Sequence, residues 1–127
     1  MGYRSEVALA IGKEIMPHFL GVLAKEPDAR SLIFKGCDHL DQNYNGEGTL
    51  LVIWHDIKWY ESCPEIKAIN SFINECEADI LEGFDLKEDE YQGDHIRFIR
   101  LGEDSDDVDQ KGTLHDWDIA MSRSLSY

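Results

Sequence analysis

The spacing of apolar residues predicts a strand and two helices in the first third of the chain. Over residues 6–12, valine, leucine and isoleucine alternate with alanine, which is the two-residue period of a strand. Because one face of this strand carries only alanine, we expect a helix to pack closely against it. Apolar residues then recur every three or four positions over 13–25, and Pro27 and Gly36 frame a second, short helix expected over 27–34.

The middle of the chain predicts a hairpin. Residues 39–44 lead into a turn over 45–48 that contains one asparagine and two glycines, which accept positive φ. The run 50–54 that follows is apolar on both faces. This composition is typical of a central strand that is covered on both sides.

A third helix is predicted to begin beside Pro64. Ser62 and Glu65 flank this proline in the pattern of a capping box, in which the serine side chain would cap the helix. An apolar stripe at helical spacing follows, and we expect it to face the sheet. It consists of Ile66, Ile69, Phe72, Ile73 and Cys76.

The last third predicts two further strands separated by an acidic loop. The first covers 95–101 and the second lies near 117–125. The order of strands and helices predicts one α+β domain over residues 1–127, with a mostly antiparallel sheet and helices packed on one face. A ferredoxin-like sandwich is one arrangement of this class.

Charge changes the picture of possible partners. The chain has 12 Lys and Arg against 26 Asp and Glu, a formal net charge of −14. Such a surface repels nucleic acid and anionic membranes, because phosphate binding requires clustered basic side chains. It is compatible with a basic protein partner, and equally with a charged surface that only maintains solubility.

The cysteines and the start of the chain predict a cytoplasmic protein. Three cysteines, Cys37, Cys63 and Cys76, cannot all be paired within one chain, so we expect free thiols in a reducing compartment. The first residues lack the apolar region of a signal peptide. The longest apolar runs are far shorter than the roughly 20 residues of a membrane span.

The densest candidate site is acidic. Residues 77–109 hold 13 of the 26 acids and three bases, and a row of negative charge there would resemble the phosphates of a duplex. The residues expected to contact a partner are Glu88, Asp89, Glu90, Glu103, Asp104, Asp106, Asp107 and Asp109. A solvated loop without a function is the alternative for the stretch 103–109.

Neither a catalytic nor a metal site is predicted. In the acidic loop, Val108 occupies a position at which a calcium loop needs Asp or Asn. The five histidines lie far apart, and the spacing Cys37-x-His39 lacks the second ligand pair of a zinc site. The sequence also lacks a phosphate-binding glycine loop and a serine nucleophile motif. We therefore expect no enzyme activity and no cofactor.

Three stretches resemble a family of small proteins encoded by bacteriophages and prophages. They are Gly-Tyr-Arg-Ser-Glu-Val over 2–7, Lys-Trp-Tyr over 58–60 and Phe-Ile-Arg-Leu-Gly-Glu over 98–103. Members of the family commonly open with Gly-Tyr-Arg-Ser-Asp-Val, so Glu6 is a mild departure. The family has no assigned activity. The resemblance implies a phage accessory protein that acts in the bacterial cytoplasm, and it carries over no catalytic residues.

Two functions follow as hypotheses. The first is a non-enzymatic inhibitor that occupies the basic surface of a host defence or nucleic-acid-binding protein by mimicking nucleic acid, of which an anti-CRISPR protein would be one kind. The second is a binder that sequesters an anionic, nucleotide-like ligand, with arginines on the phosphates and an aromatic ring on the base. The residues of this second site would be Arg4, Trp59, Tyr60, Arg97, Arg100 and Arg123.

Overall fold

A computed structural model describes residues 4–44, 46–79, 91–103, 107–114, 120–121 and 125–126. The elements follow in the order β1 (Ser5–Ile11), α1 (Met16–Lys25), α2 (Pro27–Phe34), β2 (His39–Tyr44), β3 (Thr49–Ile57), α3 (Pro64–Glu77), the 3-10 helix η1 (Gln92–His95), β4 (Ile96–Gly102), β5 (Val108–Gly112), β6 (Ala120–Met121) and β7 (Leu125–Ser126).

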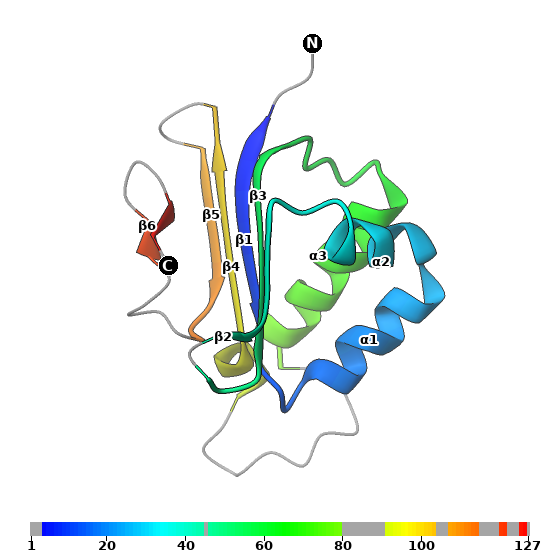
Figure 1. Cartoon of the computed structure of the whole chain (residues 1–127), viewed down its shortest axis with the longest axis vertical. Coiled ribbons are helices and arrows are strands. Elements are labelled where there is room, and N and C mark those ends of the chain that lie inside the picture. Colours follow the sequence, from blue (N-terminus) through cyan, green and yellow to red (C-terminus); the bar gives the residue numbers. More distant parts are fainter. Residues whose placement is uncertain are drawn as a thin grey trace.

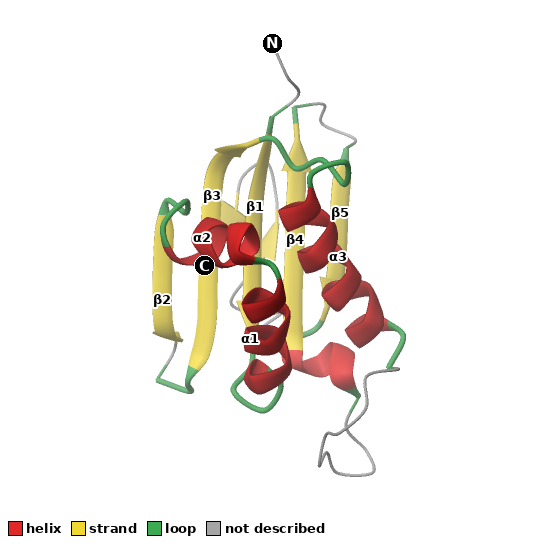
Figure 2. Cartoon of the chain, turned by 90° about the vertical axis from the view of Figure 1, so that its right-hand side faces the viewer, coloured by secondary structure: helices red, strands yellow, loops and turns green. Residues whose placement is uncertain are grey.

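The five long strands form one antiparallel sheet in the order β2-β3-β1-β4-β5. The helices α1, α2 and α3 cover one face of this sheet (Figure 1, Figure 2). The predicted α+β class is therefore confirmed. With α2 and β5 set aside, the β-α-β-β-α-β connectivity and the order 2-3-1-4 are those of the ferredoxin-like arrangement.

The central strand β1 has two buried faces, and the prediction for its alanine face is wrong. Val7, Leu9 and Ile11 belong to the cluster beneath the helices, whereas Ala8 and Ala10 belong to a separate cluster on the opposite face. The helices bury the bulkier face because it removes more apolar surface from water. The two-stranded ribbon β6–β7 lies on the alanine side of the sheet (Figure 1).

Two helix starts differ from the prediction. The first helix begins at Met16 rather than at residue 13 and has a proline in its first turn. The third helix has Cys63 as its N-cap, in an extended conformation and without a side-chain cap hydrogen bond, so the predicted capping box at Ser62 is wrong. The reason is Pro64, because a proline disfavours helical geometry in the residue before it and makes that residue the boundary.

The end of the chain also differs from the prediction. The acidic stretch runs directly into β5, which pairs with β4 from Val108 onward. Of the strand expected near 117–125, residues 117–119 and 122–124 lie outside the described part. The described remainder forms β6 and β7, which pair with each other instead of extending the main sheet. Among the described residues, none of the helices combines the length and the apolar character needed to cross a membrane.

Candidate functional site: an acidic end of the sheet beside an aromatic cavity

The structure divides the acids of 77–109 between the two ends of β4. Glu77, Asp79 and Asp94 lie near η1, whereas Glu103, Asp107 and Asp109 lie at or beside the turn between β4 and β5. Seven residues of strand separate the two groups, which is a length of about 23 Å. The described acids therefore do not form one continuous row. The predicted contact residues Glu88, Asp89, Glu90, Asp104 and Asp106 lie outside the described residues.

The second group belongs to a larger acidic surface, which we call the hairpin end. It contains the start of β1, the end of β3, the segment that leads into α3, the end of β4 and the start of β5 (Figure 1). Six described acids gather there with three Lys and Arg. The acids are Glu6, Asp56, Glu61, Glu103, Asp107 and Asp109, and the bases are Arg4, Lys58 and Arg100.

Hydrogen bonds hold the first strand in place at the hairpin end. The backbone N–H of Arg4 donates to Glu103 Oε1 at 2.8 Å, and the Arg4 Nε atom lies 3.9 Å from Asp56 Oδ1. His55 Nδ1 lies 3.2 Å from Glu6 Oε1, on the neighbouring strand. The side chain of Asp56 remains 71% exposed, so its charge faces solvent.

A cavity of about 400 Å³ opens at the hairpin end. Its lining comes from β1, the segment after β3, α3, β4 and β5, and consists of Ser5, Trp59, Tyr60, Glu61, Asn70, Phe98, Arg100, Asp107 and Asp109. It combines three aromatic rings with three carboxylates and one guanidinium.

Trp59 is fixed in this cavity by its neighbours. Its ring lies 5.4 Å from that of Trp54 and 5.7 Å from that of Phe98, measured between centroids, in tilted arrangements. Its indole Nε1–H donates to Asn70 Oδ1 at 3.1 Å, and Asn70 in turn donates to Glu61 Oε1 at 3.4 Å. These contacts hold the ring at the junction of the core and the cavity.

Arg100 is engaged by carboxylates on its own hairpin. Its two terminal nitrogens donate to Asp107 at 2.6 and 3.1 Å, one of them also to Ser5 Oγ at 3.3 Å, and Asp109 Oδ2 lies 3.5 Å away. The hydrogen bond to Asp107 is the main cause that raises the pKa of Arg100. The guanidinium charge is therefore compensated within the protein.

The residues of the predicted anion site are only partly brought together. Trp59, Tyr60 and Arg100 line one cavity, but Arg97 points to the opposite face of β4. There its guanidinium donates to the carbonyl of Gly112 at 3.0 Å and to the side chain of Gln110 at 2.9 Å. Arg4 lies beside Asp56 outside the cavity lining, and Arg123 lies outside the described residues.

Sequence reasoning missed Asp107 and Asp109 as the partners of Arg100. The sequence pattern predicts Arg100 within the strand over 95–101 and both aspartates in the acidic loop that follows it. The pairing depends on β5, which was not predicted and which places Asp109 opposite Arg100 in the strand register. The signal that could have found it is the i, i+7 spacing across a hairpin turn.

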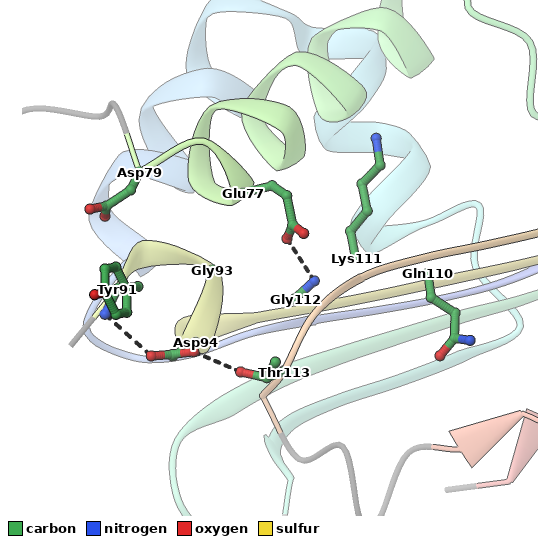
Figure 3. A pocket seen from close by; sticks show the side chains of 9 residues that line it. All are labelled: Glu77, Asp79, Tyr91, Gly93, Asp94, Gln110, Lys111, Gly112 and Thr113. Atoms are coloured by element: carbon green, nitrogen blue, oxygen red, sulfur yellow. Dashed lines mark hydrogen bonds between the residues drawn. The ribbon is translucent and has the colours of Figure 1, made fainter. Parts of the chain in front are cut away.

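A second cavity of about 290 Å³ lies near η1, between α3 and β5 (Figure 3). Glu77 accepts a hydrogen bond from the Gly112 N–H at 2.9 Å, and Asp94 accepts bonds from the Tyr91 N–H at 3.2 Å and from Thr113 Oγ1 at 2.8 Å. Asp79 accepts a bond from the Gln92 N–H at 3.0 Å. These carboxylates join α3, η1 and β5, which gives them a structural role.

Within the ranges that the structure describes, no group of three or more His, Cys, Asp or Glu is arranged to hold a metal ion. Cys37, Cys63 and Cys76 are free thiols. The chain matches no protein-family model, no curated protein and no solved structure.

Proposed function

We propose that this chain is a non-enzymatic interaction protein whose hairpin end docks on a basic surface of another protein, in place of nucleic acid. The observation that carries the proposal is the concentration of six described acids against three bases at one end of the sheet, in a chain of net charge −14. A fixed excess of carboxylates attracts clustered Lys and Arg and accelerates encounter with them.

The class of partner follows from this charge. A surface that normally binds phosphates is lined by Lys and Arg, and it binds any rigid array of anions at a suitable spacing. The resemblance to phage-encoded proteins favours a host defence protein or another nucleic-acid-binding protein of the bacterial cytoplasm as the target.

Salt provides the first test. The full chain is immobilised and exposed to bacterial lysate at about 0.05 M and at about 0.5 M salt, because the Debye length shortens roughly threefold between these conditions. We expect specific nucleic-acid-binding proteins to be retained at low salt and released at high salt. Competition by duplex DNA for the same retained protein would indicate that the two ligands share its basic surface.

A matched pair of double variants locates the surface. Asp56→Asn with Glu103→Gln removes two charges from the hairpin end, and Asp28→Asn with Glu75→Gln removes two exposed charges from the helices. Both variants remove two negative charges, so they reduce the magnitude of the net charge equally. We expect only the first pair to weaken retention, and equal retention by the two variants would contradict docking through the hairpin end.

A further inference from the structure

The aromatic cavity at the hairpin end has a charge that determines what it can bind. Glu61, Asp107 and Asp109 contribute three carboxylates and Arg100 contributes one guanidinium, so the lining is negative overall. The Arg100 side chain is only 17% exposed, whereas those of Asp107 and Asp109 are 34% and 52% exposed. A ligand that enters from solvent therefore meets the carboxylates more readily than the guanidinium.

These carboxylates retain acceptor capacity. An ionised carboxylate has about four lone-pair sites. Glu61 accepts one described hydrogen bond, from Asn70, and Asp109 approaches Arg100 through one oxygen, at 3.5 Å. An anionic ligand would have to displace Asp107 from Arg100 and lie beside two further acids. A cationic ligand would instead add to the existing carboxylates without breaking the ion pair.

The aromatic walls favour the same class of ligand. Trp59, Tyr60 and Phe98 line the cavity, and the face of an aromatic ring attracts a cation. Trp59 is already held by Trp54, Phe98 and Asn70, so little side-chain entropy is lost when a ligand packs against it.

We propose that this cavity receives one cationic side chain of the docking partner, with arginine preferred. A volume of about 400 Å³ lies within the range of ligand pockets and is large enough to admit an arginine side chain. The planar guanidinium of arginine can stack on an aromatic ring while its N–H groups reach carboxylates, which a compact ammonium does less well. The inference rests on the proposed function, since the partner's basic surface would supply the arginine, and it makes this cavity the anchor of the interface.

The test is a titration of the full, ¹⁵N-labelled chain with blocked tripeptides, followed by the indole N–H resonances in NMR spectra. The probes are acetyl-Gly-Arg-Gly-amide and the same peptide with neutral citrulline in place of arginine. We expect saturable movement of the Trp59 resonance with the arginine peptide and at least about tenfold weaker binding of the citrulline peptide, because only the former carries the charge. The backbone amide of Ile33, which is 0% exposed on α2 and does not line the cavity, serves as the internal reference.

Three results would overturn the proposal. They are a Trp59 resonance that does not move, equal binding of the citrulline peptide, and a larger response to adenosine monophosphate or inorganic phosphate than to the arginine peptide. The last result would assign the cavity to an anionic ligand, and it would be accompanied by a shift of the Arg100 side-chain N–H as Asp107 is displaced.

Two charge variants distinguish binding of the arginine peptide in the cavity from its general attraction to an acidic protein. Glu61→Gln keeps the acceptor for Asn70 but removes one charge from the cavity lining, and it should weaken arginine-peptide binding roughly three- to tenfold. Glu75→Gln removes an exposed charge near the far end of α3 and should leave binding unchanged. Equal weakening by both variants would mean diffuse attraction and would also overturn the proposal.

The two proposals fail in different ways. If no partner is retained through Asp56 and Glu103 but the arginine peptide still moves Trp59, docking is wrong and the cavity site stands. If a partner is retained in a salt-sensitive manner while Trp59 is silent to arginine, docking stands and the cavity site is wrong.

Discussion

Cys76 lies on the sheet-facing side of α3 with 0% exposure, and burial raises the pKa of its thiol from 9.0 to about 12. The unfolded chain therefore loses this proton first as the pH rises. Stability should be fully present below about pH 9 and should fall by up to about 1.4 kcal/mol per pH unit between pH 9 and 12. Urea unfolding of the wild type and of Cys76→Ala at pH 8 and pH 10.5 checks this, and we expect a shallower loss in the variant.

Thiol reactivity is the independent control for this prediction. Cys63 is half-buried at the start of α3, so an aromatic disulfide reagent at pH 8 should modify it well before Cys76. All three cysteines should react in denaturant. A Cys76 that is modified in the native protein as fast as in urea would contradict both its burial and the pH dependence.

Replacement of Gly112 should be costly, because its surroundings leave no room for a side chain. Its φ is +76°, and a Cβ atom there would clash with the carbonyl oxygen of Ile96 on the neighbouring strand. Gly46 has a similar φ of +70° but open space around it. We expect Gly46→Ala to cost about 1–2 kcal/mol of unfolding free energy through the backbone alone, and Gly112→Ala to cost clearly more, because the strand must shift as well. Equal costs in denaturant unfolding would contradict the close approach.

The buried face of α3 should contribute strongly to the stability of the fold. Ile69 and Ile73 are 0% and 1% exposed, so replacing either by alanine should cost about 2–5 kcal/mol. Asn74 is exposed and accepts a hydrogen bond from Lys111 Nζ. An exposed hydrogen bond contributes little and alanine is the better helix former, so Asn74→Ala should cost far less than either isoleucine variant. Thermal unfolding of the three variants checks this order, and a drop for Asn74→Ala as large as for Ile69→Ala would show that the helix register is wrong.

At two polar positions near α3, the hydrogen bonds of the structure determine the cost of replacement by alanine. Ser62 is exposed and lies one residue before the N-cap, so Ser62→Ala should cost little rather than the roughly 1 kcal/mol of a lost cap bond. Asn70 lies beside the apolar stripe of α3 and accepts the Trp59 indole N–H, so its replacement by alanine should cost about 1 kcal/mol.

Sequence patterns predicted the apolar elements of this fold and missed a polar one. Burial gives apolar residues a regular spacing along the sequence. This spacing predicts the strands around Leu9 and Val52 and the stripe on α3. The strand β5 consists of Val108, Asp109, Gln110, Lys111 and Gly112 and lies at the edge of the sheet. Backbone hydrogen bonds to β4 hold this strand in the sheet. Such bonds do not require a particular pattern of side chains, so a polar strand cannot be recognised from its sequence.

The candidate site was predictable to a similar extent. Trp59, Tyr60 and Arg100 were singled out as one site, and the structure brings these three to one cavity. Arg97 was assigned to the same site, although residues three apart on a strand point to opposite faces. The split of the acids between the two ends of β4 also depends on tertiary structure, since a charge count contains no distances.

At the scale of the whole molecule, net charge opposes compactness. A chain of charge −14 repels itself, and added salt screens this repulsion while leaving the buried core unaffected. We therefore expect the melting temperature to rise by several degrees between about 0.01 M and about 0.5 M sodium chloride. A melting temperature that falls with salt would mean that the ion pairs, such as that of Arg100 with Asp107, outweigh the repulsion.

The position of β1 in the sheet has a consequence for synthesis. Both of its hydrogen-bonded neighbours, β3 and β4, follow it in the chain, and β4 begins only at Ile96. During synthesis, β1 has at least one unpaired edge until β4 has been made. This point is reached when about three quarters of the chain has been synthesised. Open apolar edges recruit chaperones or other nascent chains. The yield of folded protein should therefore depend on the rate of translation through the segment that precedes β4.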